Sequence, residues 1–182
     1  IATGLDSFAL LAIPFFILSG QIMSKGGIAN RLISFAKTLV GFLPGGLALI
    51  NIVSAMLMGA IAGSAMASAS AMGTILGPEM EKEGYSKEFG AAVNITSSTT
   101  GLVIPPSNTL IVYSLASGGV SIAALFLAGY IPGILTGLLM MIVAMIWAKK
   151  NNYPVGKRSS LKEVFVKFID AFPSCLLYTS DA

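Results

Sequence analysis

Three long stretches without any charged residue limit what this chain can fold into. Residues 7–24, 38–78 and 89–148 contain no Asp, Glu, Lys or Arg over 18, 41 and 60 residues. About 20 apolar residues in a helix cross the hydrocarbon core of a bilayer. Only 10% of all residues are charged, whereas a soluble domain carries about 25%. The sequence therefore predicts an all-α integral membrane protein, and it argues against nucleic-acid binding, disorder and a disulfide scaffold.

The residue types that are absent limit the chemistry. The chain has no His and a single cysteine, Cys175, which excludes an imidazole base, a histidine metal site and an internal disulfide. Because the sequence opens at Ile1 rather than Met, we expect a piece of a longer protein. Residues 7–24 lack the flanks of a signal peptide.

The basic residues predict the topology. They form three clusters, at residues 25–37, at Lys82 and Lys87, and at residues 149–167. The positive-inside rule places such clusters in the cytoplasm. Residues 1–25 are then one transmembrane helix, 81–88 a cytoplasmic loop, and 118–150 a transmembrane helix kinked at Pro132. The chain must also cross the membrane an even number of times between Lys37 and Lys82.

Two segments have the pattern of helices that lie on the membrane surface. In residues 26–46, apolar residues at helical spacing form one face and polar residues form the other. Residues 151–174 show the same pattern after a basic stretch, and we expect a cytoplasmic amphipathic connector there. The simplest interpretation of both segments is a connector lying on lipid.

Residues 47–80 are unusually rich in small side chains. Of the 15 residues from 59 to 73, 12 are Gly, Ala or Ser. Small residues let helices approach closely, so a tightly packed helix pair is one interpretation. The other is a re-entrant hairpin of two half-helices, 47–62 and 67–80, with a tip at 63–65. The hairpin meets the requirement for an even number of crossings.

Residues 89–117 combine polarity with prolines at membrane depth. Six of the seven residues 94–100 are polar, and Pro105 and Pro106 follow. Proline lacks an N–H, so the carbonyls of Gly101 and Leu102 are expected to lose their helical partners. We predict a broken transmembrane helix whose carbonyl, hydroxyl and amide oxygens suit Na⁺. The alternative is a proline kink satisfied by neighbouring helices.

Four motifs in order resemble the large membrane subunit of TRAP transporters, the DctM-like tripartite ATP-independent periplasmic family. The resemblance covers about residues 4–172, corresponding to the first half of that permease without its first helix. The motifs are Leu-Leu-Ala-Ile-Pro-Phe-Phe-Ile-Leu-Ser-Gly at 10–20, Gly-Ala-Ile-Ala-Gly-Ser-Ala at 59–65, Pro-Glu-Met at 78–80 with Gly84-Tyr85, and Ile-Pro-Pro-Ser at 104–107.

The resemblance implies an elevator-type secondary transporter, of which this chain would carry the first inverted repeat. It implies Na⁺-coupled import of organic acids, such as C4-dicarboxylates or sialic acid, across a bacterial inner membrane by a multi-pass protein. The implied partners are a small TRAP membrane subunit and a periplasmic solute-binding protein. No organic cofactor is implied.

The predicted site lies between the hairpin tip and the broken helix. The Na⁺ ligands are expected among Gly63, Ser64, Gly101, Ser107, Asn108 and Thr109. The substrate contacts are expected among Asn94, Ser97, Ser98, Pro105 and Pro106. No Asp or Glu occurs between 89 and 148, so neutral oxygens must hold the ion, which favours a monovalent cation.

Other functions have less support in the sequence. An intramembrane serine hydrolase using Ser64 would need a His or a membrane-depth Lys, and neither is present. A channel would need rings of charge or repeated filters. The divalent anion–Na⁺ symporters are the nearest rival, because Ser107-Asn108-Thr109 is similar to their Ser-Asn-Thr signatures and they work without a binding protein. Residues 175–182 depart from the TRAP pattern, and we expect them to be a non-native tail.

Overall fold

Every named element in the described part of the chain is a helix. The computed structural model describes residues 18, 26–156 and 159–176. Within these residues the one β-type pairing is an isolated bridge between Pro44 and Val155. The predicted all-α class is confirmed for these residues.

Some predictions lie outside the described residues. The predicted transmembrane helix 1–25 does so except at Leu18, and the motif at 10–20 lies in the same stretch. Most of the predicted tail 175–182 is also outside.

The helices follow one another with short connections. In chain order they are α3 (Ile28–Val40), α4 (Gly46–Ala62), α5 (Ala65–Lys82), α6 (Lys87–Ser98), η1 (Thr99–Leu102), α7 (Asn108–Ala116), α8 (Ile122–Lys150) and α9 (Leu161–Leu176). Several bounds differ from the expected segments, most clearly those of α3 and α9. Helix α3 is shorter than the predicted 26–46, because a turn and bridge occupy its last residues, and α9 continues two residues past the predicted end at 174.

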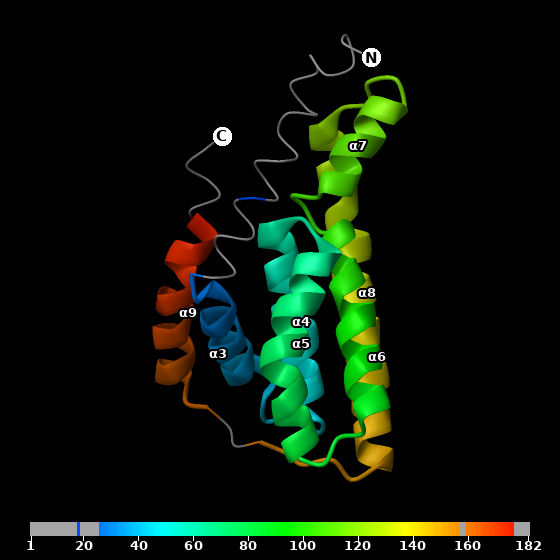
Figure 1. The fold of residues 1–182 in the computed structure, drawn as a ribbon. Coiled ribbons are helices and arrows are strands. Elements are labelled where there is room, and N and C mark those ends of the chain that lie inside the picture. The colour runs from blue at the N-terminus through cyan, green and yellow to red at the C-terminus, as the bar shows by residue number, and fades with distance from the viewer. Residues whose placement is uncertain (1–17, 19–25, 157–158, 177–182) are drawn as a thin grey trace.

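Helices α4 and α5 form an antiparallel pair at the centre of the fold. Figure 1 shows them between α3 and α9 on one flank and α6 and α8 on the other. Helix α4 is buried on nearly all sides because it packs against α3, α5, α6, η1 and α8. The turn between the pair is only Gly63 and Ser64.

The helical structure that begins with α6 is interrupted where the prolines occur. Helix α6 passes into the short 3₁₀ turn η1, which ends at Leu102, and α7 begins only at Asn108. The peptide bond between Pro105 and Pro106 in this gap is cis. Proline in the interior of a helix removes a hydrogen bond and clashes with the preceding turn, which accounts for the gap.

Helix α8 has two unlike faces. Its buried residues are all small, namely Gly129, Gly133, Gly137, Ala144 and Ala148, whereas large apolar side chains such as Leu127, Ile131 and Val143 are exposed. Because Gly129 and Gly133 have no side chains, the Val103 carbonyl and the Ile104 side chain can approach the α8 backbone closely. Of the helices in the described residues, α8 alone is long and apolar enough to cross a membrane. Helix α4 is apolar but shorter.

An aromatic cluster joins the ends of three helices. Tyr85 stacks on Tyr153 with ring centroids 4.3 Å apart, and Phe89 stacks on Trp147 at 6.2 Å. The Ser86 N–H also donates to Tyr153 Oη at 3.3 Å. Burial raises the pKa of Tyr85 to about 12, so its phenol stays neutral at physiological pH. The cluster holds the start of α6 and the end of α5 beside the end of α8.

We expect the two ends of the bundle to face opposite sides of the membrane, with the aromatic cluster on the cytoplasmic side. Gly84 and Gly118 give a matched pair for cysteine labelling, because both have φ of +85° and open space where a Cβ would stand. In a Cys175→Ser background of the full-length permease, a membrane-impermeant maleimide added outside should modify Gly118→Cys and spare Gly84→Cys. Modification of Gly84→Cys in sealed cells would contradict this topology.

Candidate functional site

The tip of the α4–α5 pair touches the chain just before α7. The Asn108 N–H donates to the Gly63 carbonyl at 3.4 Å. Gly63 has φ of +58°, and a Cβ placed there would stand 2.9 Å from the Pro106 carbonyl oxygen. Only glycine combines a left-handed conformation with this close approach. Residue 63 is therefore fixed as glycine by its backbone and by its neighbour.

A second close approach lies one turn below the tip. A Cβ on Gly101 would stand 2.9 Å from the Cα of Gly59, so η1 and α4 meet backbone to backbone. Together with the tip contact, this brings the predicted Na⁺ residues Gly63, Ser64 and Gly101 to one place. Asn108 joins them from the start of α7.

Four helix ends converge at this contact, which gives the region its electrostatic character. Helices α4 and η1 end there, at Ala62 and Leu102, and α5 and α7 begin there, at Ala65 and Asn108. The last carbonyls of a helix carry partial negative charge, and its first N–H groups carry partial positive charge. A cation and an anion can thus bind side by side without any ionised side chain.

Ser107 joins the two sides of the gap. It is completely buried, its hydroxyl donates to the Leu102 carbonyl at 2.6 Å, and it accepts from the Leu110 N–H at 3.4 Å. The expectation that the Leu102 carbonyl is unpaired is therefore wrong, because a side chain replaces the N–H that proline lacks. Ser64 caps α5 in the same manner, accepting from the Ala67 N–H at 3.4 Å.

The predicted substrate residues fall into two places. Pro106 lies at the tip, and Pro105 is buried beside it in the chain. Ser97 and Ser98 are buried in α6, where both hydroxyls donate to the Asn94 carbonyl, at 3.2 and 2.7 Å. Thr109, a predicted Na⁺ ligand, is exposed in the first turn of α7. The described contacts do not bring the α6 residues to the tip.

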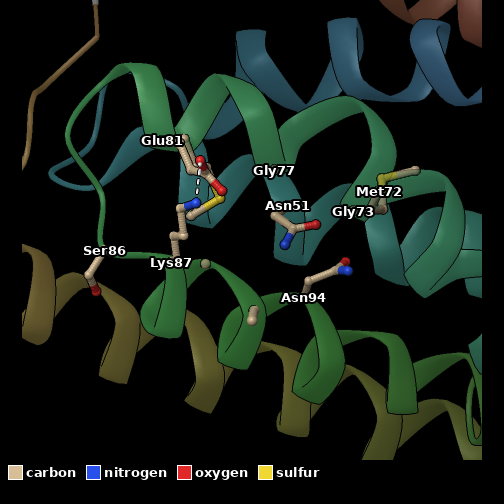
Figure 2. Close-up of a pocket in the computed structure, with 11 residues that line it drawn as sticks. Asn51, Met72, Gly73, Gly77, Glu81, Ser86, Lys87 and Asn94 are labelled. Carbon is tan, nitrogen blue, oxygen red and sulfur yellow. Dashed lines mark ion pairs between the residues drawn. The ribbon is translucent and has the colours of Figure 1, made fainter.

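A cavity of about 220 Å³ lies between α4, α5 and α6, away from the tip. Figure 2 shows Asn51 of α4 and Asn94 of α6 directed toward the same space. Asn51 is 1% exposed and was not among the site residues predicted from the sequence. The signal in the sequence was a lone amide in a mostly apolar helix, because polar side chains at membrane depth are costly and mark functional positions.

Few charges lie near either place. The cavity is lined by one ion pair, between Lys87 Nζ and Glu81 Oε2 at 3.4 Å, and both side chains are well exposed (Figure 2). The described residues contain no group of three or more His, Cys, Asp or Glu that could hold a metal ion. Any cation bound at the tip must rely on neutral oxygens.

Comparisons with known proteins identify the family. The family model "Tripartite ATP-independent periplasmic transporter, DctM component" matches residues 1–179. The "uncharacterized protein YgiK" of Salmonella typhimurium is 58% identical over 174 residues, covering 96% of this chain and 40% of the relative. The C4-dicarboxylate TRAP transporter large permease protein DctM of Vibrio cholerae is 45% identical, covering 85% and 35%. The sialic acid TRAP transporter large permease protein SiaM of the same organism is 38% identical, covering 95% and 40%.

The chain thus spans about 40% of the length of these relatives. The relatives named for a function are transporter permeases, which confirms that this chain is not an enzyme. The match also extends past Cys175 to residue 179. This chain belongs to the membrane-embedded DctM component family of the tripartite ATP-independent periplasmic transporters.

Proposed function

We propose that the chain is the first inverted repeat of the large membrane subunit of a Na⁺-coupled TRAP transporter that imports organic acids. The relatives DctM and SiaM are named for C4-dicarboxylates and sialic acid, and YiaN of Escherichia coli for 2,3-diketo-L-gulonate. An organic acid is what these names share. The proposed location is the bacterial inner membrane, crossed several times, and the proposed partners are a small membrane subunit and a periplasmic binding protein.

The observation that carries this proposal is the contact between Gly63 and Asn108. It joins the turn of one helix pair to the restart of an interrupted helix. Irregular backbone at membrane depth is tolerated only where it is buried in protein or lines a watery cavity. We therefore propose that α4 and α5 form a re-entrant hairpin and that α6, η1 and α7 form one broken transmembrane helix.

The kind of oxygen at this contact supports Na⁺ coupling. The ends of α4 and η1 offer carbonyls, and Ser64, Ser107 and Asn108 offer neutral side-chain oxygens. A bound Na⁺ would join the hairpin to the broken helix and order the place where substrate binds. Substrate would then bind more tightly when Na⁺ is present, and by linkage Na⁺ would bind more tightly when substrate is present.

The anionic substrate fits the opposite charge at the same contact. Helices α5 and α7 both direct their first N–H groups there, and helix N-termini bind carboxylates. Of the predicted substrate residues, Pro105 and Pro106 lie in this region, whereas Asn94, Ser97 and Ser98 lie in α6, and all five stay predictions. An elevator motion would carry the whole contact across the membrane.

The proposal is tested by transport with the full-length permease and its small subunit in liposomes. We expect uptake of an organic acid to require both a Na⁺ gradient and a periplasmic binding protein. Uptake that is equally fast without any binding protein would instead support a divalent anion–Na⁺ symporter. Uptake unchanged by replacing Na⁺ with choline would contradict Na⁺ coupling.

Ser64→Ala and Asn108→Ala should each raise the Na⁺ concentration for half-maximal uptake at least about tenfold, since a bond to a charged partner contributes about 1.5–3 kcal/mol. Ser121→Ala is the matched control, because Ser121 caps α8 by the same kind of bond, to the Ala124 N–H at 3.4 Å, and it is exposed and lines neither the tip nor the cavity. If both tip variants change only substrate affinity, the Na⁺ site lies elsewhere.

A further inference from the structure

Two residues that line the cavity between α4, α5 and α6 carry acceptor oxygens without partners. Asn51 Oδ1 and Asn94 Oδ1 are both buried, and neither has a hydrogen-bond partner in the structure. Both residues line the cavity of about 220 Å³. A buried polar group without a partner costs about 1–3 kcal/mol, so such groups need an explanation.

The orientation of the Asn94 amide is fixed by its neighbour. Its Nδ2 donates to the Ala69 carbonyl at 2.8 Å, and a carbonyl can only accept, so Oδ1 must be the free atom. A free amide oxygen repels the carboxylate of an organic acid. It attracts a cation or a hydrogen-bond donor. Asn94 therefore suits a cation better than the contact with an anionic substrate that was predicted for it.

The size and charge of the cavity narrow the class of ligand. At about 30 Å³ for each water, the cavity accommodates about seven waters, or one small cation with most of a hydration shell. Its single carboxylate, on Glu81, is already paired with Lys87. Divalent cations usually recruit several carboxylates, so this neutral set of oxygens suits a monovalent ion.

Buried polar side chains lie between the cavity and the tip. Nine residues of helix separate Ser64 from Gly73, which is about 14 Å at 1.5 Å per residue. Three buried polar residues lie between these levels, namely Ser68 of α5, Ser97 of α6 and Thr100 of η1. All three are at most 1% exposed. The other end of the cavity reaches Ser86 in the loop before α6, beside the aromatic cluster.

We propose that Asn51 and Asn94 form an inner Na⁺ site, distinct from the tip, where the ion is held partly hydrated before it leaves on the side of the Glu81–Lys87 pair. The proposal rests on the Na⁺ coupling proposed above. It adds a second ion position and a route between the two.

The test is equilibrium binding of ²²Na⁺ to the purified full-length permease with its small subunit. Asn51→Leu should weaken one class of bound Na⁺ about tenfold, and Asn51→Asp should strengthen it about tenfold. If Asn51 serves only packing, Asn51→Asp should destabilise the permease and should not strengthen Na⁺ binding, since a buried carboxylate without a cation is strongly destabilising. Asn30→Asp, on the exposed surface of α3, controls for added charge.

A cavity-filling variant keeps the test independent of protein stability. Gly77 lines the cavity and has open space at its Cβ position, so Gly77→Leu should fold, improve helix propensity and displace the ion. Unchanged Na⁺ binding in Gly77→Leu and Asn51→Asp overturns the inner site. If Asn108→Ala alone removes bound Na⁺, the tip proposal stands while the inner site fails, and if the wild-type permease binds no Na⁺, both fail.

Discussion

Gly63→Val is expected to abolish transport while the permease still inserts into the membrane. The residue needs φ of +58°, which a β-branched side chain rarely adopts, and a Cβ would stand 2.9 Å from the Pro106 carbonyl. Because that neighbour is backbone, the hairpin tip and the start of α7 must separate. The measurement is binding-protein-dependent uptake in liposomes, with the amount of reconstituted protein determined in parallel.

A matched control separates backbone strain from the contact. Gly84 has φ of +85° in the loop after α5, with nothing near its Cβ position. Gly84→Val therefore carries the strain, about 1–3 kcal/mol, without disturbing the tip. We expect it to reduce stability modestly and retain uptake. Equal loss of uptake in the two variants, at equal protein amounts, would show that strain alone matters and that the tip contact does not.

The second large effect is expected for Ser107→Ala. The change removes a helix cap, about 1 kcal/mol, and leaves the partly buried Leu102 carbonyl without its donor, about 1–3 kcal/mol more. We expect the free energy of unfolding to fall by about 2–4 kcal/mol. The measurement is thermal unfolding of the detergent-solubilised permease, with and without Na⁺.

Ser121→Ala is the control for the cap alone. Ser121 caps α8 by accepting from the Ala124 N–H at 3.4 Å, but it is exposed. Its loss should cost about 1 kcal/mol or less. If the free energy of unfolding falls no more for Ser107→Ala than for Ser121→Ala, the bond from Ser107 to the Leu102 carbonyl contributes little. If Na⁺ stabilises both variants as it does the wild type, Ser107 is not an ion ligand.

Local composition was sufficient to predict where the chain turns and where a helix stops. The small residues of 59–73 and the pair Pro105-Pro106 act within a few residues of themselves, so the turn at Gly63-Ser64 and the gap before Asn108 follow from the sequence. Charge patterning likewise marks the ends of α5 and α8, at Lys82 and Lys150. Such features need no knowledge of distant neighbours.

The contacts across the bundle could not be predicted in this way. The bond from Ser107 to the Leu102 carbonyl depends on how the chain folds back over five residues, and the carbonyl was expected to be free. Asn51 and Asn94 are 43 positions apart in the sequence, and nothing local indicates that they share a cavity. Packing of α4 against α6 brings them together, and only a three-dimensional structure shows it.

The aromatic cluster at the base of the bundle has a consequence for the order of assembly. The bond between Ser86 and Tyr153 closes a separation of 67 residues, whereas the turn of the α4–α5 pair is only two residues long. Long loops cost more entropy to close and form later than local contacts. During synthesis the hairpin should therefore pair first, and Tyr85 and Phe89 should stay uncovered until the ribosome has released the last turn of α8. A chaperone or insertase acting on the nascent chain would encounter these rings during that interval.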